Sequence, residues 1–202
     1  MKNKRWYPVM YMFIVTAILS AAVIGFSQYT QAMVQANQER NFEIAILKVL
    51  PDMYDPGLSS IELHKKFTEQ VDQPTEQTAD AYTLRKNGII EAYALPIEGQ
   101  GFWAPIKAVI GIKSDTKTIT NLVIYEQRET PGLGAEVAKK EFTKQFENLV
   151  LSIDNKPISF RRPGEELQQG QVHAVTGATQ TSTRLEKVIN DNLNQWREKL
   201  NN

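Results

Sequence analysis

The chain has 202 residues, with 23 lysines and arginines against 23 aspartates and glutamates, so its formal net charge is zero. A general nucleic-acid binder would carry a basic excess, and we expect no nucleic-acid partner. Apolar residues make up 42% of the chain and charged residues 23%, which is typical of a folded domain and argues against extensive disorder. The absence of cysteine excludes disulfides, thiolate metal sites and a cysteine nucleophile, and with only two histidines we expect no metal site.

The N-terminal segment predicts a membrane anchor. Residues 8–26 contain almost no polar side chain, and as a helix they would span roughly 28 Å, enough to cross a hydrocarbon core of about 30 Å. Lys2, Lys4 and Arg5 precede this stretch and no charge follows until Glu39, which places the N-terminus in the cytoplasm and the later residues outside. The alternative is a cleaved signal peptide, whose apolar region would be about 7–15 residues long and would end in small residues.

Four segments follow from this interpretation. We expect a cytoplasmic tail at residues 1–5, a transmembrane anchor at 6–27, a juxtamembrane helix and linker at 28–58, and one extracytoplasmic domain at 59–202. The juxtamembrane helix is predicted because the chain there lacks glycine and proline and becomes increasingly apolar until Pro51.

The first half of the domain predicts a helix and two hairpins. Ser59-x-x-Glu62 is the capping-box pattern of a short helix over residues 59–67, and the polar residues 71–80 are typical of a loop. The predicted strand pairs are 81–86 with 89–96, joined by the hairpin signal Asn87-Gly88, and 106–114 with 118–126.

The second half predicts further helices around short strands. Residues 135–146 resemble a helix, and residues 149–153 and 157–160 are candidates for two paired strands. The last helix is the clearest element, because apolar side chains recur at helical spacing after the capping-box pattern Thr183-x-x-Glu186. Its apolar stripe consists of Leu185, Val188, Ile189, Leu193, Trp196 and Leu200. Together the elements predict an α+β fold with a mainly antiparallel sheet and flanking helices.

Two glycine-bearing loops each precede a predicted helix. The second loop, residues 176–183, presents five hydroxyl groups at the start of the last helix, where unpaired N–H groups and the helix dipole favour a phosphate. In the first loop, Pro-Gly suits a turn with positive φ at Gly132. Each loop alone is equally compatible with an ordinary turn before a helix. The first loop reads Glu129-Thr130-Pro131-Gly132-Leu133-Gly134.

The two loops together resemble the FMN-binding subunits of ion-translocating respiratory complexes. In that family the flavin-attachment motif ends in Ser/Thr-Gly-Ala-Thr, here Thr176-Gly177-Ala178-Thr179, and the first loop is similar to the second hallmark. The single N-terminal span and the Gly-x-Gly-Phe-Trp segment at residues 99–103 extend the resemblance along the chain. It is greatest to the C subunit of the sodium-translocating NADH:quinone oxidoreductase and next to the G subunit of the Rnf complex.

The resemblance implies a redox subunit that carries FMN in phosphoester linkage to Thr179 and passes electrons within a complex of the inner, cytoplasmic membrane. It implies other membrane subunits as partners, and a flavin transferase that uses FAD and magnesium. The subunit would have no catalytic residue of its own, because the flavin carries the chemistry. The implied cofactor-binding residues are Thr179, Thr176, Gly177, Ala178, Glu129, Thr130, Pro131, Gly132, Leu133, Gly134 and Trp103.

Some residues near the loops have two interpretations. His173 stands where the family motif usually has an acidic residue, six positions before the attached threonine. It is either a histidine at a strand end or a contact of the phosphate or the transferase. Arg184 either is solvated or neutralises the phosphate. Contact with the flavin ring and burial in the core are the alternatives for Trp103, Tyr125 and Leu133.

Three functions from different classes stay open at this point. The first is a redox subunit with covalent FMN at Thr179. The second is a binding module that holds FMN without a covalent bond, and the third is an assembly subunit whose anchor packs against partner spans. A flavin that survives denaturation, a flavin that is released by it, and a colourless complex distinguish the three.

Overall fold

The apolar N-terminal stretch and the residues after it form one helix, α1 (Trp6–Val49), and Pro51 lies just beyond its end. The computed structural model describes residues 6–152 and 156–201, so the predicted cytoplasmic tail at residues 1–5 lies outside the described part. Within that part, α1 holds the one helical stretch that is long and apolar enough to cross a membrane, with a mean hydropathy of 2.3.

The chain divides within this helix into two compact units, Met1–Arg40 and Asn41–Asn202. The boundaries predicted from the sequence, after residue 27 and after residue 58, follow membrane topology and linker position, so they stay predictions.

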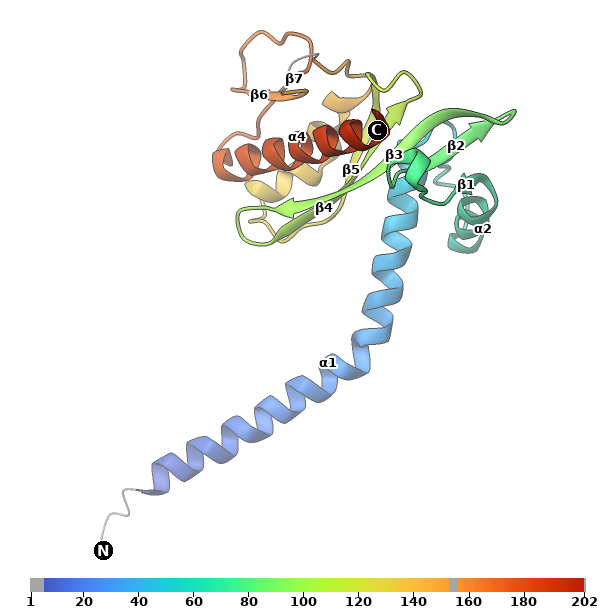
Figure 1. Cartoon of the computed structure of the whole chain (residues 1–202). Coiled ribbons are helices and arrows are strands. Elements are labelled where there is room, and N and C mark those ends of the chain that lie inside the picture. Colours follow the sequence, from blue (N-terminus) through green and yellow to red (C-terminus); the bar gives the residue numbers. More distant parts are fainter. Residues whose placement is uncertain (1–5, 153–155, 202) are drawn as a thin grey trace, which may run out of the picture. The chain divides into compact units, whose positions relative to one another are not determined.

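Five antiparallel strands form the sheet of the second unit, in the order β1-β2-β3-β4-β5 (Figure 1). Their bounds are β1 Val71–Asp72, β2 Tyr82–Lys86, β3 Ile89–Gln100, β4 Pro105–Lys113 and β5 Ile119–Glu126. Both predicted hairpins are confirmed. Asn87 and Gly88 have positive φ values of 55° and 80°, which the two-residue turn of the first hairpin requires.

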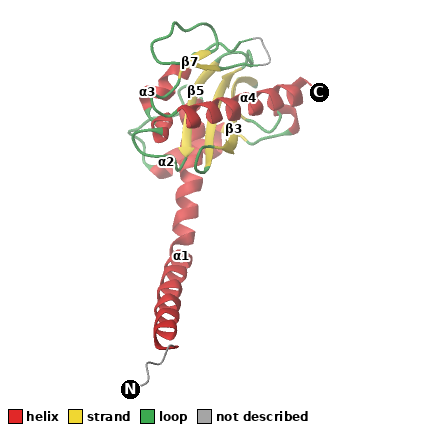
Figure 2. Cartoon of the chain, turned by 90° about the vertical axis from the view of Figure 1, so that its left-hand side faces the viewer, coloured by secondary structure: helices red, strands yellow, loops and turns green. Residues whose placement is uncertain are grey.

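Side chains alternate between the two faces of the sheet, so each face buries a core of its own. On one face, Leu95 of β3 and Ile110 of β4 pack with the apolar stripe of helix α4 (Thr179–Asn201). Figure 2 shows α4 lying across the strands. The stripe is buried as the sequence predicted, since Leu185 and Ile189 have no exposed surface.

The other face is covered by the C-terminal end of α1 and by helix α2 (Ser60–Gln70). Ile46 of α1 and Phe67 of α2 are both buried there. Helix α2 begins with the predicted capping box. The Glu62 N–H donates to Ser59 Oγ (3.4 Å), and the Ser59 N–H donates to Glu62 Oε2 (2.8 Å).

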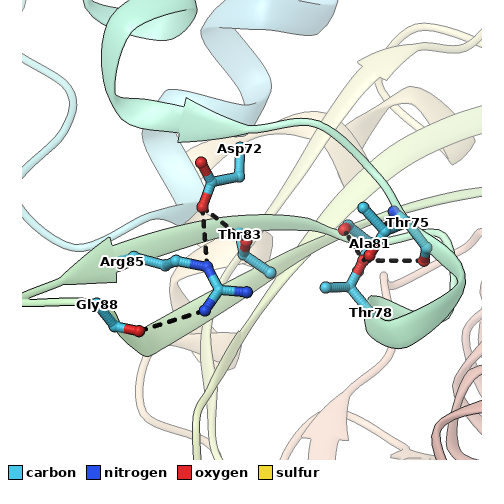
Figure 3. Close-up of polar contacts among 7 residues, drawn as sticks. All are labelled: Asp72, Thr75, Thr78, Ala81, Thr83, Arg85 and Gly88. Carbon is cyan, nitrogen blue, oxygen red and sulfur yellow. Dashed lines mark hydrogen bonds and ion pairs between the residues drawn. The ribbon is translucent and has the colours of Figure 1, made fainter.

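The prediction of a loop over residues 71–80 is wrong in part. Its start is strand β1, which pairs with β2, and Glu76–Thr78 form the short 3-10 helix η1. Figure 3 shows how the Asp72 carboxylate accepts hydrogen bonds from Arg85 Nε (3.0 Å) and Thr83 Oγ1 (3.4 Å) of β2. A strand of two residues is too short to show apolar alternation, so its sequence carries no strand signal.

The predicted helix over residues 135–146 is interrupted at Lys139, which is extended (φ −80°, ψ 152°). Its parts are η2 Gly134–Ala138, α3 Lys140–Thr143 and η3 Lys144–Phe146. Val137 and Phe142 both reach the core under α4. On a continuous helix, at about 100° per residue, Phe142 would lie about 140° around the axis from Val137. The break at Lys139 thus turns two side chains that a continuous helix would point apart toward one core.

The predicted pairing of residues 149–153 with 157–160 is wrong in part: the Ser152 N–H donates to the Pro157 carbonyl (3.0 Å), but the described residues of the two segments do not form paired strands. Of the first segment, residues 149–152 are described, and the Leu151 N–H donates to a carbonyl just before β5 (2.8 Å). The second segment contributes to β6 (Ser159–Arg161), which pairs in parallel with β7 (Gln171–His173). Strands this short find partners through tertiary packing, which local sequence does not encode.

Replacing Ile110 by alanine is expected to lower the free energy of unfolding by about 2–5 kcal/mol, because the fully buried side chain leaves a cavity. Ile89 is 74% exposed, so Ile89→Ala is a matched control that should cost less than about 1 kcal/mol. Urea unfolding of the full chain in detergent, followed by far-UV circular dichroism, measures both. Equal losses would contradict the assignment of the core.

Candidate functional site

Three segments that are far apart in the sequence line one cavity of about 350 Å³. They are the turn between β3 and β4, the loop after β5, and the loop before α4. Both predicted glycine-bearing loops and the Phe-Trp segment therefore meet at this cavity. The lining residues are Phe102, Trp103, Glu129, Thr130, Leu133, Gly134, Gly177, Ala178, Thr179, Gln180 and Thr181.

The loop after β5 is shaped by a turn at Gly132. Its φ of +75° confirms the prediction made from Pro131-Gly132. The N–H groups of Leu133 and Ala135 both donate to the Thr130 carbonyl, each at 3.1 Å, so the loop closes on itself. The turn leaves Leu133 45% exposed on the cavity wall, which contradicts its interpretation as a core residue.

The loop before α4 turns directly into the helix. Gly177 has a φ of +76°, and the Ala178 N–H donates to the Val175 carbonyl (3.2 Å). Helix α4 then begins at Thr179. The predicted start at the capping-box residue Thr183 is wrong, because that residue lies inside the helix.

The first turn of α4 offers hydrogen-bond donors to the cavity. The backbone N–H groups of residues 179–181 have no acceptor among the residues that the structure describes. Helix α4 is 23 residues long, and the start of a helix carries partial positive charge. Unpaired donors and a helix dipole at one point are suited to a phosphate group.

The five hydroxyl groups of this loop fall into two classes. Thr181 and Ser182 are buried and bonded: Thr181 Oγ1 donates to Glu129 Oε2 (2.7 Å), and Ser182 Oγ accepts a bond from the Val175 N–H (3.2 Å). The exposed hydroxyls belong to Thr176, Thr179 and Thr183. Of these three, only Thr179 lines the cavity, so the residue singled out by the motif is also the accessible one at the site.

The Glu129 side chain connects all three segments. It is 5% exposed, and its Oε1 accepts hydrogen bonds from the backbone N–H groups of Phe102 (2.9 Å) and Trp103 (3.1 Å). Its Oε2 accepts the bond from Thr181. Each carboxylate oxygen is therefore engaged by the protein itself, which offsets the cost of burying the group.

The turn between β3 and β4 brings two aromatic rings to the rim of the cavity. Phe102 is 41% exposed and Trp103 66%, so the interpretation of Trp103 as a core residue is wrong. Trp103 Nε1 donates to Thr130 Oγ1 (3.1 Å). Arg184 Nη1 donates to the Gly101 carbonyl (3.3 Å), with the guanidinium 5.7 Å from the centre of the Phe102 ring, so Arg184 supports this turn.

Other residues singled out in the sequence lie away from the cavity. Pro131, Gly132 and Thr176 belong to the two loops but do not line it. Tyr125 lies on the opposite face of the sheet, in edge contact with the Phe42 ring (5.5 Å between centroids). Burial there, with smaller contributions from nearby carboxylates, raises the pKa of Tyr125 to about 12.

His173 is at the end of strand β7, in agreement with one of its two interpretations. Its Nε2 lies 2.9 Å from the Glu165 carbonyl, and its backbone N–H donates to Gln145 Oε1 (2.8 Å). It does not line the cavity that contains Thr179.

Sequence reasoning missed the roles of Gln180 and Thr181. Both line the cavity because α4 begins earlier than the capping-box pattern indicated. Two residues along a helix correspond to about 200°, so Thr181 points to the side opposite Thr179 and into the protein. Nothing in the sequence marked Glu129 as its partner 52 positions earlier.

Comparison with known families identifies part of the chain. Residues 101–194, which include every residue of the cavity wall, match the family model described as FMN-binding domain.

Curated relatives include the C subunit of the Na⁺-translocating NADH-quinone reductase from Chlamydia pneumoniae, 32% identical over 107 residues. That match covers 51% of this chain and 33% of the relative. The C subunit from Vibrio anguillarum is 32% identical over 108 residues, covering 52% of this chain and 42% of the relative. The chain thus spans less than half the length of these relatives.

Solved structures share the fold. The crystal structure of the C subunit of the Na⁺-translocating NADH-quinone reductase from Parabacteroides distasonis has a TM-score of 0.69 and 23% identity, covering 84% of this chain and 96% of that one. NqrC from Shewanella oneidensis has a TM-score of 0.69 and 16% identity, covering 82% and 99% of the two chains. The α+β fold that the sequence predicted is therefore shared with these structures.

Gly134→Ala is expected to lower the free energy of unfolding by about 1–3 kcal/mol, because the new Cβ would lie 2.5 Å from Thr181 Oγ1 and 2.9 Å from the Glu129 side chain. Gly57→Ala is the control, since its Cβ would meet only the Asp55 side chain, at 3.3 Å, and should cost about 0.5 kcal/mol or less. Urea unfolding measures both variants. If the two variants were equally stable, the close packing described for the cavity wall would be refuted.

Proposed function

We propose that the chain is the redox subunit of a membrane-bound Na⁺-translocating NADH:quinone oxidoreductase, carries FMN in phosphoester linkage to Thr179, and passes electrons within the complex. The single observation that carries the proposal is the accessible Thr179 hydroxyl at the start of α4, inside the cavity that joins both hallmark loops. The relatives, which are named as C subunits of such a reductase, and the match to the FMN-binding domain support the same function.

The residues of the cavity suit the parts of FMN. The unpaired N–H groups of residues 179–181 are donors for the phosphate, and the dipole of α4 complements its charge. Trp103 and Leu133 offer exposed apolar surface for the flavin ring. When bound, FMN supplies the redox chemistry, which no protein side chain provides. The chain's own part is to hold the phosphate and to orient the ring.

Attachment requires a partner enzyme. A threonine hydroxyl is a weak nucleophile without an adjacent base, and the one titratable side chain on the described cavity wall, Glu129, is already engaged by three donors. We therefore assign the step to a flavin transferase that uses FAD and magnesium. The Thr179 oxygen forms a bond to the FMN phosphorus of FAD while the bond between the two phosphates breaks. AMP leaves, and the hydroxyl proton passes to a base of the transferase.

We further propose that the subunit is a single-pass protein of the inner, cytoplasmic membrane, with its FMN-binding domain on the extracytoplasmic side, and the apolar stretch of α1 supports the anchor. The apolar stretch of α1 has no charged residue before Glu39, so this helix offers no path for an ion. Ion movement must then take place in other membrane subunits, which are the partners of this chain and exchange electrons with it.

Intact mass spectrometry of the full chain, co-expressed with a flavin transferase, is expected to show a gain of about 440 Da, the mass of FMN less water. Thr179→Val should lose this gain completely, because valine keeps the shape of threonine but has no oxygen to esterify. Thr183→Val is the matched control, since Thr183 is exposed on the same helix but does not line the cavity, and should keep the gain. An unmodified wild-type chain would defeat the proposal.

The second candidate is a membrane-anchored module that holds FMN without a covalent bond. It is favoured by His173 at the position where the attachment motif usually has an acidic residue. On a denaturing gel under ultraviolet light, covalent FMN keeps the band of this chain fluorescent, whereas non-covalent FMN leaves the band dark although the native protein is yellow. A further alternative, the G subunit of an Rnf complex, is tested by identifying the proteins that co-purify.

A further inference from the structure

The Glu129 carboxylate is a candidate for a role that differs from cofactor binding. It accepts three hydrogen bonds, from the N–H groups of Phe102 and Trp103 and from the Thr181 hydroxyl. It is 5% exposed, and within the described part of the chain it forms no ion pair with a lysine, arginine or histidine. The buried carboxylate is therefore held by directional hydrogen bonds, and such bonds to a charged acceptor fix the positions of their donors.

Two glycines leave room for this carboxylate. A Cβ at Gly101 would lie 2.6 Å from Glu129 Oε1, and a Cβ at Gly134 would lie 2.9 Å from Glu129 Oε2. Atoms this close would force the carboxylate out of its position. Gly134 lines the cavity, and its missing Cβ also leaves room for the Thr181 hydroxyl, which would lie 2.5 Å from it.

The three hydrogen bonds of Glu129 connect the loop after β5 to the other two segments of the cavity wall. Those to Phe102 and Trp103 hold the turn that carries the exposed aromatic rings. The bond to Thr181 fixes the first turn of α4, and because Thr179 lies about 200° around the helix from Thr181, an inward Thr181 turns Thr179 outward.

We propose that Glu129 is a positioning residue: its buried carboxylate ties the three loops together and thereby presents the Thr179 hydroxyl for modification, without contacting the flavin. The hydrogen bonds that link the loops are seen in the structure, and their consequence for flavin attachment rests on the proposed function.

Amide hydrogen exchange of the full chain in detergent tests the link between the loops directly. In Glu129→Ala, exchange at the Phe102 and Trp103 amides should rise roughly tenfold or more, because both donors lose their acceptor. Exchange in strands β3 to β5 should stay unchanged. Glu129→Gln should restore protection at both amides, since its side-chain oxygen can accept both bonds and its NH₂ can donate to the Thr181 oxygen.

Flavin loading, measured by intact mass after co-expression with the transferase, is the second readout. Glu129→Ala should load on the order of tenfold more slowly or worse, because misplaced reacting groups lose orientation, and Glu129→Gln should load as the wild type does. Rescue by glutamine separates positioning by hydrogen bonds from a need for the negative charge. A glutamine variant as impaired as the alanine variant in both readouts would overturn the proposal.

A second pair of variants covers the case in which Glu129→Ala does not fold. Thr181→Val removes one of the three bonds and keeps the shape of the side chain, whereas Thr181→Ser keeps the hydroxyl. The valine variant should slow loading and loosen the first turn of α4, and the serine variant should not. If valine and serine behave alike, the proposal is overturned.

The two readouts also separate this proposal from the proposed function. A wild-type chain that never gains FMN would refute the proposed function, while unchanged exchange at Phe102 and Trp103 in Glu129→Ala would refute the positioning role of Glu129.

Discussion

The packing of helix α4 across one face of the sheet is the interaction on which the rest of the structure depends. Leu185, Ile189 and Leu193 are completely buried between the helix and the strands, so the axis of α4 is fixed by the core. Trp196 fixes its far end through a hydrogen bond from Nε1 to the Thr78 carbonyl (3.1 Å). Because the core holds the helix, its first turn stays beside the loop after β5, and these two segments form the cavity together with the turn between β3 and β4.

The parts of the fold that the sequence predicted are those with a strong local signal. The hairpin around Asn87-Gly88 and the apolar stripe of α4 each carry such a signal within a few residues. The predictions that were wrong concern segments whose structure depends on packing against other elements of the fold. Val137 and Phe142 both contact the core under α4 from either side of the break at Lys139, and β1 is held by its pairing with β2 and by the burial of Val71. Neither contact is visible in a local pattern.

The candidate site was predicted in outline but not in its internal contacts. The motif resemblance selected both loops and Thr179, and the structure places them around one cavity. It did not indicate that Thr181 is buried against Glu129 or that Glu129 bonds to the turn of Trp103. A motif records which residue types recur, and it does not say which of them face the ligand and which face each other. Only the packing of the three segments separates these two roles.

The central claim is that the hydroxyl at the start of α4 is where the flavin phosphate is attached. Trypsin releases residues 162–184 as one peptide, which contains every hydroxyl of the loop before α4. Fragmentation of this peptide by tandem mass spectrometry, after isolation from an active membrane complex, locates the modification among them. The account predicts that FMN phosphate is found on Thr179 alone. A bare Thr179 in a flavin-dependent, active complex, or FMN on a neighbouring hydroxyl, would contradict it.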